Sequence, residues 1–304
     1  MDMIIGVDGG GTKTEAVAYD FFGRTLAQGR SGHGNVLVDE KQAVMHILDA
    51  VKQCLSVCPT WTCVKLILGL AGSDSGANRQ KLETALSSLG IPFCIMNDAE
   101  LAHAAALKGQ DGILTISGTG SISYGLKGAH FETSGGWGHL LGDEGSGYWL
   151  VMAAFKQMIR DDDAGAQVAP LSAALLEKIG VRRPTELKSF VYVKEKGAIA
   201  ALVPVIVAAA QAGDARAQQL LKDAGVHLAK MTMNLHRRMA FDPQASIAIR
   251  GGVLTQIAQV KASFANVLKA QLPQAQLIEI DDSATRGAYY LMKKNQNKAS
   301  EANR

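Results

Sequence analysis

The stretch MIIGVDGGGTKT, residues 3–14, begins with an apolar run that passes straight into three glycines. Residues Met3 to Val7 are β-formers and predict a buried strand that ends at Asp8. Glycines after a strand allow backbone N–H groups to turn inward and surround phosphate oxygens. The loop is neither a Walker loop nor a Rossmann fingerprint, because the next segment reads as a hairpin strand and no GK[ST] ending follows. Alone, it fits either a phosphate-binding turn or a plain tight hairpin.

The same chemistry returns in GILTISGTGS, residues 112–121, where a second apolar run meets a loop of glycines and a threonine. A turn requirement explains either loop separately, but it does not explain why the two loops match. Two such loops, each with a threonine hydroxyl among glycines, can grip a polyphosphate between two domains.

The segments after each loop follow one order. The first set has strands at 13–19, 25–29, 64–70 and 91–96, a turn at 22–23, and helices over 39–57, through Leu82, Leu86 and Leu89, and up to Ala106. This is the βββαβαβα order of a ribonuclease-H-like unit. The second set repeats it with strands at 121–126, 130–133, 247–250 and 276–280, and with helices dominating 143–239. The chain therefore reads as an internal duplication of one topology.

Composition narrows the class of protein. Of the 304 residues, 47% are hydrophobic and 19% charged, with a net charge of +3, which excludes general disorder and disfavours nucleic acid as the main partner. The longest apolar stretch, 199–210, contains Pro204 and is too short to span a bilayer. Without a basic segment before the first strand, we expect a soluble cytoplasmic protein that contacts no membrane.

The four cysteines lack paired C-x-x-C spacing and are expected to be buried, reduced thiols. Residues 161–163, three aspartates, read as a solvated acidic loop.

Asn97-Asp98 follows a predicted strand, at the end where α/β folds place ligands. An aspartate there could accept a hydroxyl proton during phosphoryl transfer. Both residues are also good helix caps. The two roles are compatible if Asn97 caps the turn while Asp98 points toward the ligand.

The segment GGWGHLLGDEGSG, residues 135–147, interleaves glycines with a tryptophan, a histidine and two acids. Such a segment must be held by tertiary contacts or by a ligand. A tryptophan face near carboxylates suits a sugar, although Trp137 could instead plug a core and Asp143-Glu144 could begin a helix. His139 reads more readily as a structural histidine than as a base.

Further on, Arg250-Gly251-Gly252 ends a late strand. The two glycines expose backbone that could lie against an adenine ring, or they could simply allow a helix to pack closely on the strand.

Taken in order and spacing, DGGGTKT, NDA, SGTGS, GGWGHLLGDEGSGYW and IRGG resemble the N-acetylglucosamine kinases. More broadly, the chain resembles the sugar kinase/heat-shock protein/actin superfamily and its BadF/BadG/BcrA/BcrD ATPase branch, which includes acyl-CoA dehydratase activators. The similarity runs from Gly6 to Ala288. It implies an α/β fold of two ribonuclease-H-like (actin-like ATPase) domains with an interdomain cleft. The first domain would hold residues 1–109 and a C-terminal helix at 283–298, and the second would hold residues 110–282 with a helical insertion.

The resemblance also implies roles for individual residues. Asp98 would be the catalytic base and would contact the sugar. ATP would be bound by Asp8, Gly10, Gly11, Thr12, Lys13, Gly118, Thr119, Gly120, Ala200, Gly251 and Gly252. The amino sugar would be bound by Asn35, Ser73, Asn97, Asp98, Gly136, Trp137, Gly138, His139, Leu140 and Asp143. Asp8 would hold Mg²⁺, directly or through a water. The implied partners are ATP and a small amino sugar, and a homodimer is left open.

The implied activity is ATP-dependent phosphorylation of the 6-hydroxyl of an amino sugar, with N-acetylglucosamine favoured over N-acetylmuramic acid and glucosamine. A non-enzymatic ATP-binding regulator is a rival, against which the retained Asp98 argues. A redox activator with an iron–sulfur cluster is disfavoured because all four cysteines precede the second glycine loop. The compact Cys/His zinc motif of ROK kinases is absent from the sequence.

Overall fold

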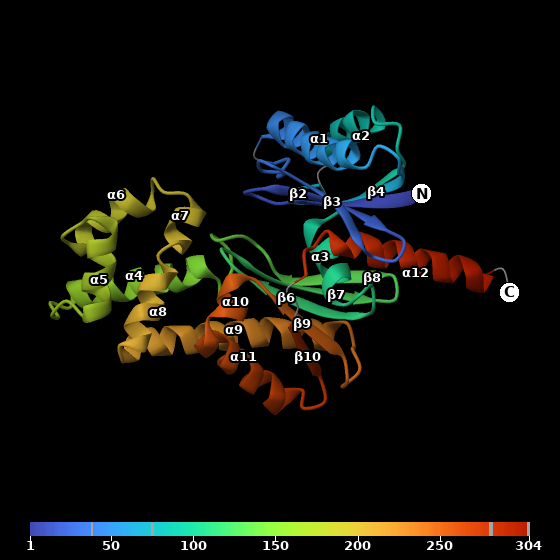
Figure 1. Cartoon of the computed structure of the whole chain (residues 1–304). Helices are drawn as coiled ribbons and strands as arrows, with labels where there is room; N and C mark the ends of the chain where they lie inside the picture. The colour runs from blue at the N-terminus through green and yellow to red at the C-terminus, as the bar shows by residue number, and fades with distance from the viewer. Residues whose placement is uncertain (38, 74–75, 280–281, 303–304) are drawn as a thin grey trace. The chain divides into compact units, whose positions relative to one another are not determined.

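The computed structural model describes residues 1–37, 39–73, 76–279 and 282–302. The chain forms two compact units, Met1–Gln110 together with Asp281–Arg304, and Asp111–Ile280. Each unit is built on a mixed five-stranded sheet with helices against it (Figure 1). The expected fold class, a duplicated ribonuclease-H-like topology, is confirmed by these two sheets.

The sheet of the first unit has the strand order β3-β2-β1-β4-β5. Its strands are β1 (Asp2–Gly9), β2 (Thr14–Asp20), β3 (Thr25–Ser31), β4 (Thr62–Leu70) and β5 (Phe93–Met96). The first three strands form an antiparallel meander, whereas β4 pairs parallel to β1 and β5 parallel to β4. The carboxyl ends of β1, β4 and β5 therefore meet at one edge.

Helices cover both faces of this sheet, namely α1 (Glu40–Val57), α2 (Gly76–Ser87), α3 (Asp98–Ala106) and α12 (Arg286–Ala302). Successive residues of the central strand β1 point to opposite faces, so Met3, Ile5 and Val7 join the core under α1 and α2. Ile4 joins a second core with Leu101 of α3 and Ala288 of α12. A strand buried on both faces is why residues 3–7 read as a continuous apolar run.

The last helix belongs to the first unit through very close packing. A Cβ on Gly287 would lie 2.2 Å from the Leu101 carbonyl oxygen, and a Cβ on Gly6 would lie 2.2 Å from the Thr285 carbonyl oxygen. The Thr285 hydroxyl also lies 2.8 Å from the Tyr19 hydroxyl of β2. Only glycine permits backbones to approach this closely.

The sheet of the second unit has the corresponding order β10-β9-β6-β7-β8. Its strands are β6 (Gly112–Ser117), β7 (Ser121–Lys127), β8 (His130–Gly135), β9 (Ser246–Arg250) and β10 (Gln276–Glu279). Strands β6, β7 and β8 are an antiparallel meander, and β9 pairs parallel to β6 and β10 parallel to β9. Residue 280, the predicted end of the last strand, lies outside the described residues.

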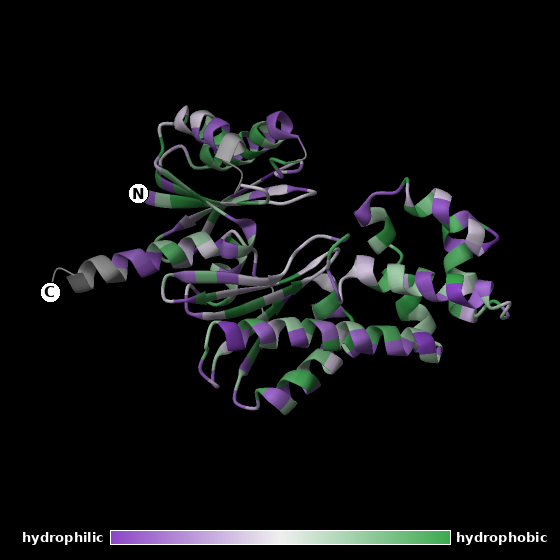
Figure 2. Cartoon of the chain, turned by 180° about the vertical axis from the view of Figure 1, so that it is seen from behind, coloured by the Kyte–Doolittle hydropathy of each residue, from purple (hydrophilic) through white to green (hydrophobic). Residues whose placement is uncertain are grey.

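Helices are concentrated between β8 and β9. They are α4 (Gly147–Asp163), α5 (Pro170–Ile179), the 3-10 turn η1 (Pro184–Glu186), α6 (Leu187–Val191), α7 (Lys196–Ala200), α8 (Val203–Gln211) and α9 (Ala215–Arg238), followed by α10 (Gly252–Gln256) and α11 (Ala258–Gln271) after β9. The long helix α9 carries alternating hydrophobic and hydrophilic bands in Figure 2, because one of its faces packs into the core of the unit.

Three local predictions were wrong. The helix through Leu82 and Leu86 ends at Ser87, so Leu89 lies in the turn that follows. The strand predicted from Ile91 begins at Phe93, after Pro92, which has no N–H to donate to a ladder. The aspartates at 161–163 are not a loop, because they form the end of α4, where Asp161 pairs with Arg216.

Candidate functional site

In the first unit, the predicted residues gather where β1, β4 and β5 end. The sheet register places Asp8 opposite Gly69, and Gly69 opposite Met96. The Ala71 N–H donates to the Gly9 carbonyl at 2.9 Å, so the segments that leave β1 and β4 remain together. Asp8, the segment at 71–73 and Asn97-Asp98 therefore share one edge of the sheet.

Hydrogen bonds of the backbone fix the loop after β1, while residues 11–13 of the loop are exposed. The Gly10 N–H donates to the Lys13 carbonyl at 3.1 Å, which closes the turn, and the Gly10 carbonyl accepts the Gly34 N–H at 2.9 Å. A Cβ on Gly34 would lie 2.6 Å from Gly9 Cα, so position 34 requires glycine. Gly11, Thr12 and Lys13 are exposed, and Asp8 is half-buried. The predicted phosphate-contacting groups are thus available to a ligand.

Beside this loop, the Thr14 hydroxyl is buried without a hydrogen-bond partner among the described residues. Its neighbour Glu15 is also buried. Burial raises the pKa of Glu15, but the Ser283 hydroxyl, Lys13 and Arg30 together bring that pKa below its ordinary value. The carboxylate therefore stays ionised next to the loop at neutral pH.

The segment at the end of β5 has both of the roles expected from sequence. Asn97 is the N-cap of α3, and its side chain accepts the Ala99 N–H at 2.9 Å. Asp98 is the first residue of α3 and is half-buried, with one carboxylate oxygen 3.0 Å from the same N–H. Ser73, which is buried, donates to the Met96 carbonyl at 3.1 Å. Asn35 reaches the same neighbourhood, because a Cβ on Gly72 would lie 3.1 Å from its side-chain oxygen.

In the second unit, the corresponding loop after β6 contains Gly118, Thr119 and Gly120. The Gly118 N–H donates to the Gly120 carbonyl at 2.9 Å, and the Gly118 carbonyl accepts the Gly147 N–H at 2.8 Å. Thr119 is exposed, while Ser117 and Ser121 on either side are buried. Backbone hydrogen bonds therefore fix this loop as well, while its threonine is exposed.

Two further residues predicted to bind the nucleotide lie near this loop. Gly251, with φ of +91°, approaches so closely that a Cβ there would lie 2.3 Å from the Ser117 carbonyl oxygen. Ala200, at the end of α7, lies 3.4 Å from the position of a Cβ on Gly147. Gly252 begins α10 and is exposed. The structure thus brings Gly118, Gly251 and Ala200 into one neighbourhood.

Asp143 lies behind the same loop rather than at the surface. It is 3% exposed, adopts φ of +64°, and accepts the Ser121 N–H at 3.3 Å. Its other carboxylate oxygen is 2.6 Å from Lys196 Nζ of α7. A Cβ on Gly120 would lie 2.7 Å from that ammonium group. Sequence reasoning missed Lys196, which lies 53 residues from Asp143 and is marked by no motif.

The segment at 136–142 carries its apolar side chains outward. Trp137 is 74% exposed and Leu140 is 84% exposed, so the alternative in which Trp137 plugs a core is wrong. Gly136 and Gly138 have positive φ, and the Gly142 N–H donates to the Gly138 carbonyl at 2.9 Å, which closes the turn. His139 is exposed, and its ring packs edge-on against Tyr148 at 4.9 Å between centroids.

The cysteines only partly meet expectation. All four are free thiols; Cys54 and Cys58 are buried, but Cys63 is half-buried and Cys94 exposed. Burial raises the pKa of Cys54 and of Cys63 to about 11, so both resist conversion to thiolates. Among the described residues there is no group of three or more His, Cys, Asp or Glu side chains suited to holding a metal ion.

Comparison with known proteins places the chain in a family. Residues 5–289 match the BadF/BadG/BcrA/BcrD ATPase family. The chain belongs to this family. An N-acetylmuramic acid/N-acetylglucosamine kinase of Clostridium acetobutylicum is 28% identical, covering 95% of this chain and 97% of its own length. An N-acetyl-D-glucosamine kinase of Dictyostelium discoideum is 27% identical with the same coverage.

Solved structures agree on the fold. A Chromobacterium violaceum protein provisionally assigned as an N-acetylglucosamine kinase superposes with a TM-score of 0.75 at 23% identity, covering 95% of this chain and 98% of that chain. In the described part of this family member, every helix is too short or too polar to cross a bilayer.

Proposed function

We propose that this family member is an ATP-dependent kinase that phosphorylates the 6-hydroxyl of an amino sugar, most readily N-acetylglucosamine. The observation that carries the proposal is the pair of pinned glycine–threonine loops, one in each unit, together with the half-buried Asp98 at the end of β5. Both full-length relatives named above are N-acetylglucosamine kinases, and the family is one of ATPases.

Phosphoryl transfer asks a protein mainly for positioning and for stabilisation of charge. Exposed Thr12 and Thr119, each in a loop whose backbone is fixed from behind, would contact the phosphates through hydroxyl and N–H donors. Lys196 lies beside Gly120, within reach of the same loop, and would add positive charge there. Gly251 approaches Ser117 at the start of that loop, and Ala200 lies beside Gly147, whose N–H bonds the loop, so both would border the nucleoside.

ATP with its Mg²⁺ supplies the transferable phosphoryl group and offsets its charge. Mg²⁺ commonly takes only one or two protein carboxylates and otherwise binds phosphates and waters. The half-buried Asp8 at the end of β1 fits that need, and it would hold the ion directly or through a water. The buried, unpartnered Thr14 hydroxyl beside the loop marks a polar environment that also suits hydrated ligands.

On the sugar side, Asp98 would accept the proton of the hydroxyl that receives the phosphoryl group. Its position at the N-terminus of α3 favours the ionised carboxylate, which is the form a base needs. Asn35 and Ser73, which lie close by, would orient sugar hydroxyls. Trp137 and Leu140 expose apolar surface that would cover the acetyl group or the apolar face of the ring.

The test measures ADP release by the purified full chain with ATP, Mg²⁺ and each of N-acetylglucosamine, N-acetylmuramic acid, glucosamine and glucose. Asp98→Asn should lower kcat with N-acetylglucosamine by about 10³-fold, the size of a lost general base. Its fold should be unchanged, because an amide oxygen can still accept the Ala99 N–H. Glu83→Gln, at an exposed ion pair on α2, serves as the matched control and should retain full activity.

The position of transfer is read by phosphorus–proton NMR coupling in the product, where phosphate on C6 couples to the exocyclic methylene. Absence of ADP release with every sugar would reject the kinase proposal. Near-normal turnover of Asp98→Asn would reject the role of Asp98 alone. Preference for glucosamine over N-acetylglucosamine would reject the substrate assignment while leaving the reaction intact.

A further inference from the structure

Three charged side chains form a row across the first three strands of the first unit. The register pairs Asp8 of β1 with Glu15 of β2, and Glu15 with Arg30 of β3. Residues paired across neighbouring strands point to the same face of a sheet, so all three side chains lie on one face. The row lies at the edge where β1 ends and β2 begins, next to the glycine loop. Sequence reasoning assigned no role to Arg30.

A buried carboxylate holds the Arg30 side chain in this row. Glu15 is 7% exposed, and one of its carboxylate oxygens accepts hydrogen bonds from Arg30 Nε at 3.3 Å and from Arg30 Nη2 at 3.1 Å. The other oxygen accepts the Ser283 hydroxyl at 2.8 Å. Two donors from one planar guanidinium fix its orientation better than a single hydrogen bond would. Arg30 is therefore a pre-oriented cation.

The Ser283 hydroxyl that contacts Glu15 belongs to a chain of hydroxyl groups. Its oxygen lies 2.9 Å from the Thr285 hydroxyl, which lies 2.8 Å from the Tyr19 hydroxyl of β2. Thr285 and Tyr19 are both buried. Because these hydrogen bonds run from the core of the unit to the Glu15 carboxylate, they give the carboxylate, and through it Arg30, a rigid support.

The outer part of Arg30 remains available to a ligand. Its side chain is 67% exposed, although the side chain of its partner Glu15 is only 9% exposed. Glu15 takes the Nε and Nη2 groups of Arg30, and Nη1 donates to no described residue. A guanidinium presents its donors in a planar fork that matches phosphate oxygens. Lys13 of the exposed glycine loop is a second cation close by, since it helps to lower the pKa of Glu15.

The place of the row in the chain indicates which part of a nucleotide Arg30 would meet. Asp8, at the other end of the row, is the residue proposed to hold Mg²⁺, and in phosphoryl transfer such an ion contacts the last two phosphates. Asp98, the proposed base, belongs to the same unit, whereas Gly251 and Ala200, proposed to border the nucleoside, belong to the other unit. The first unit therefore supplies the groups suited to the phosphate that is transferred.

We propose that Arg30 is a further nucleotide-binding residue, and that its guanidinium donates hydrogen bonds to the terminal phosphate of ATP. Glu15 and Ser283 are positioning residues in this scheme, because they act only through Arg30. The inference rests on the proposed function, in which ATP is the phosphoryl donor. A cation that is oriented before the ligand arrives needs no reorganisation to stabilise the charge of that phosphate.

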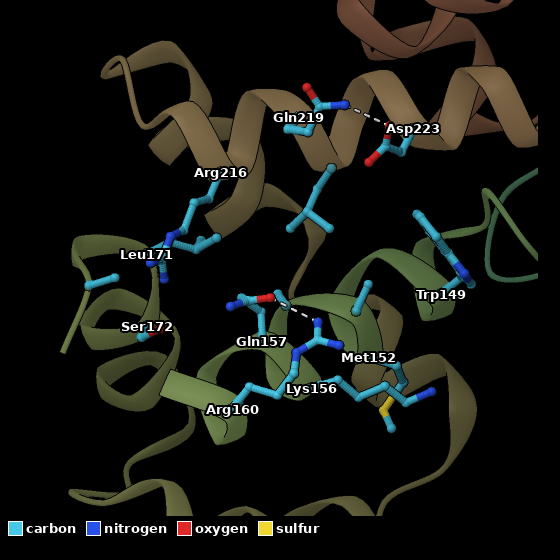
Figure 3. A pocket seen from close by; sticks show the side chains of 14 residues that line it. Trp149, Met152, Lys156, Gln157, Arg160, Leu171, Ser172, Arg216, Gln219 and Asp223 are labelled. Atoms are coloured by element: carbon cyan, nitrogen blue, oxygen red, sulfur yellow. Dashed lines mark hydrogen bonds between the residues drawn. The ribbon is translucent and has the colours of Figure 1, made fainter. Parts of the chain in front are cut away.

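A second group of arginines offers an alternative place for phosphates. A cavity of about 540 Å³ in the helical part of the second unit is lined by residues that include Arg160 and Arg216. In Figure 3 both side chains lie beside the cavity, and a dashed line marks the hydrogen bond from Arg160 to Gln157, at 2.8 Å. Arg216 pairs with the partly exposed Asp161. No lining residue is among those proposed to bind sugar or nucleotide, so the cavity provides a control.

The test measures binding of a non-hydrolysable imido analogue of ATP and of ADP to the full chain by calorimetry, both with Mg²⁺. Arg30→Gln should weaken the ATP analogue by about 10- to 100-fold, the size of a lost hydrogen bond to a charged group, and should leave ADP unchanged. Two control variants should bind both nucleotides like the parent. Arg24→Gln removes an arginine that pairs with Asp20 at the other end of the same hairpin, and Arg160→Gln removes one from the cavity of Figure 3.

Glu15→Gln tests the positioning role. It should weaken the ATP analogue and leave ADP unchanged, because Arg30 keeps its charge but loses its fixed orientation. The double variant Arg30→Gln/Glu15→Gln should lose no more affinity than Arg30→Gln alone, since Glu15 acts through Arg30. If Glu15 were merely structural, its substitution would weaken ADP as well and would add to the effect of Arg30→Gln.

Three results would overturn the proposal. One is an Arg30→Gln variant that binds the ATP analogue as tightly as Arg24→Gln does. Another is an equal loss of the ATP analogue and ADP in Arg30→Gln, which would make Arg30 a structural residue. The third is weakening by Arg160→Gln in its place, which would assign the phosphates to the helical cavity. The first two leave the kinase assignment intact, provided that the parent releases ADP with an amino sugar. If the parent binds neither nucleotide, this proposal and the proposed function are both wrong.

Discussion

The ion pair between Lys196 and Asp143 lets one substitution test how the loop after β6 is held. Lys196→Met removes the ammonium group 2.6 Å from a carboxylate whose side chain is 4% exposed, while the lysine itself is 30% exposed. Among the described residues, Asp143 would then keep only the hydrogen bond from the Ser121 N–H, at 3.3 Å. Removing one partner of a buried pair leaves an uncompensated charge.

The expected cost follows from that geometry. Loss of one partner from a fully buried pair costs ~3–5 kcal/mol, and the partial exposure of Lys196 lowers the expectation to about 2 kcal/mol. For a unit of this size, a loss of about 2 kcal/mol corresponds to a fall in melting temperature of about 4–8 °C. The double variant Lys196→Met/Asp143→Asn should recover most of this loss, because it removes the stranded charge together with its partner.

The assay is thermal and urea unfolding of the parent, both single variants and the double variant, followed by circular dichroism. Lys269→Met, at an exposed lysine of α11, is the matched control and should change the midpoint little. If Lys196→Met were no more destabilising than Lys269→Met, or if the two single effects simply added in the double variant, the pair would not stabilise the loop. The KM for ATP of Lys196→Met, which should rise, separately measures the proposed contribution to phosphate binding.

Three further outcomes follow from the packing and the titrating groups. Gly251→Ala should lower the free energy of unfolding by about 3 kcal/mol or more, because the new Cβ would lie 2.3 Å from the Ser117 carbonyl oxygen. Gly180 also has positive φ but has open space around it, so Gly180→Ala should cost only about 1 kcal/mol. Melting temperatures of the two variants measure the difference. The pKa of Glu15 is lower in the folded protein than its unfolded value of about 4.3. The ionised carboxylate therefore stabilises the fold above that unfolded pKa, and this stabilisation is lost as pH falls through the folded pKa. In acid unfolding scans, the stability advantage of the parent over Glu15→Gln should disappear. In a thiol-reagent titration the exposed Cys94 should react first, and Cys54 only upon unfolding, since burial raises the pKa of Cys54 to about 11.

The fold could be predicted largely because its local signals are periodic. The apolar run at 3–7 predicts a strand buried on both faces, and the structure places Met3 and Ile4 in separate cores. Asn97 was expected to cap a helix from its residue type, and it is the N-cap of α3. Errors arose where tertiary contacts decide an end, as with the aspartates of α4, of which Asp161 is held by Arg216.

The candidate site was less accessible to sequence reasoning, because side-chain environment is a property of folded neighbours. Asp143 was expected to bind the sugar or to begin a helix, yet it is buried against Lys196, which no motif marks. Trp137 could instead have been a core residue, yet most of its surface is exposed. The burial of Asp143 does not follow from spacing, since it depends on the return of Lys196, which lies 53 positions further along the chain.

The two glycine loops are anchored to the rest of their units by the same kind of hydrogen bond. In the first unit the Gly10 carbonyl accepts the N–H of Gly34, and in the second the Gly118 carbonyl accepts the N–H of Gly147. In each loop a glycine carbonyl therefore accepts the N–H of a glycine far along the chain, while the threonine of the loop is exposed. Sequence shows the loops as a matched pair but not their partners, because a glycine that permits close backbone approach looks like any other glycine until the chain has folded. The duplicated feature is thus the loop together with its anchoring glycine, and under the proposed function this anchoring would hold two exposed turns in place to position phosphates.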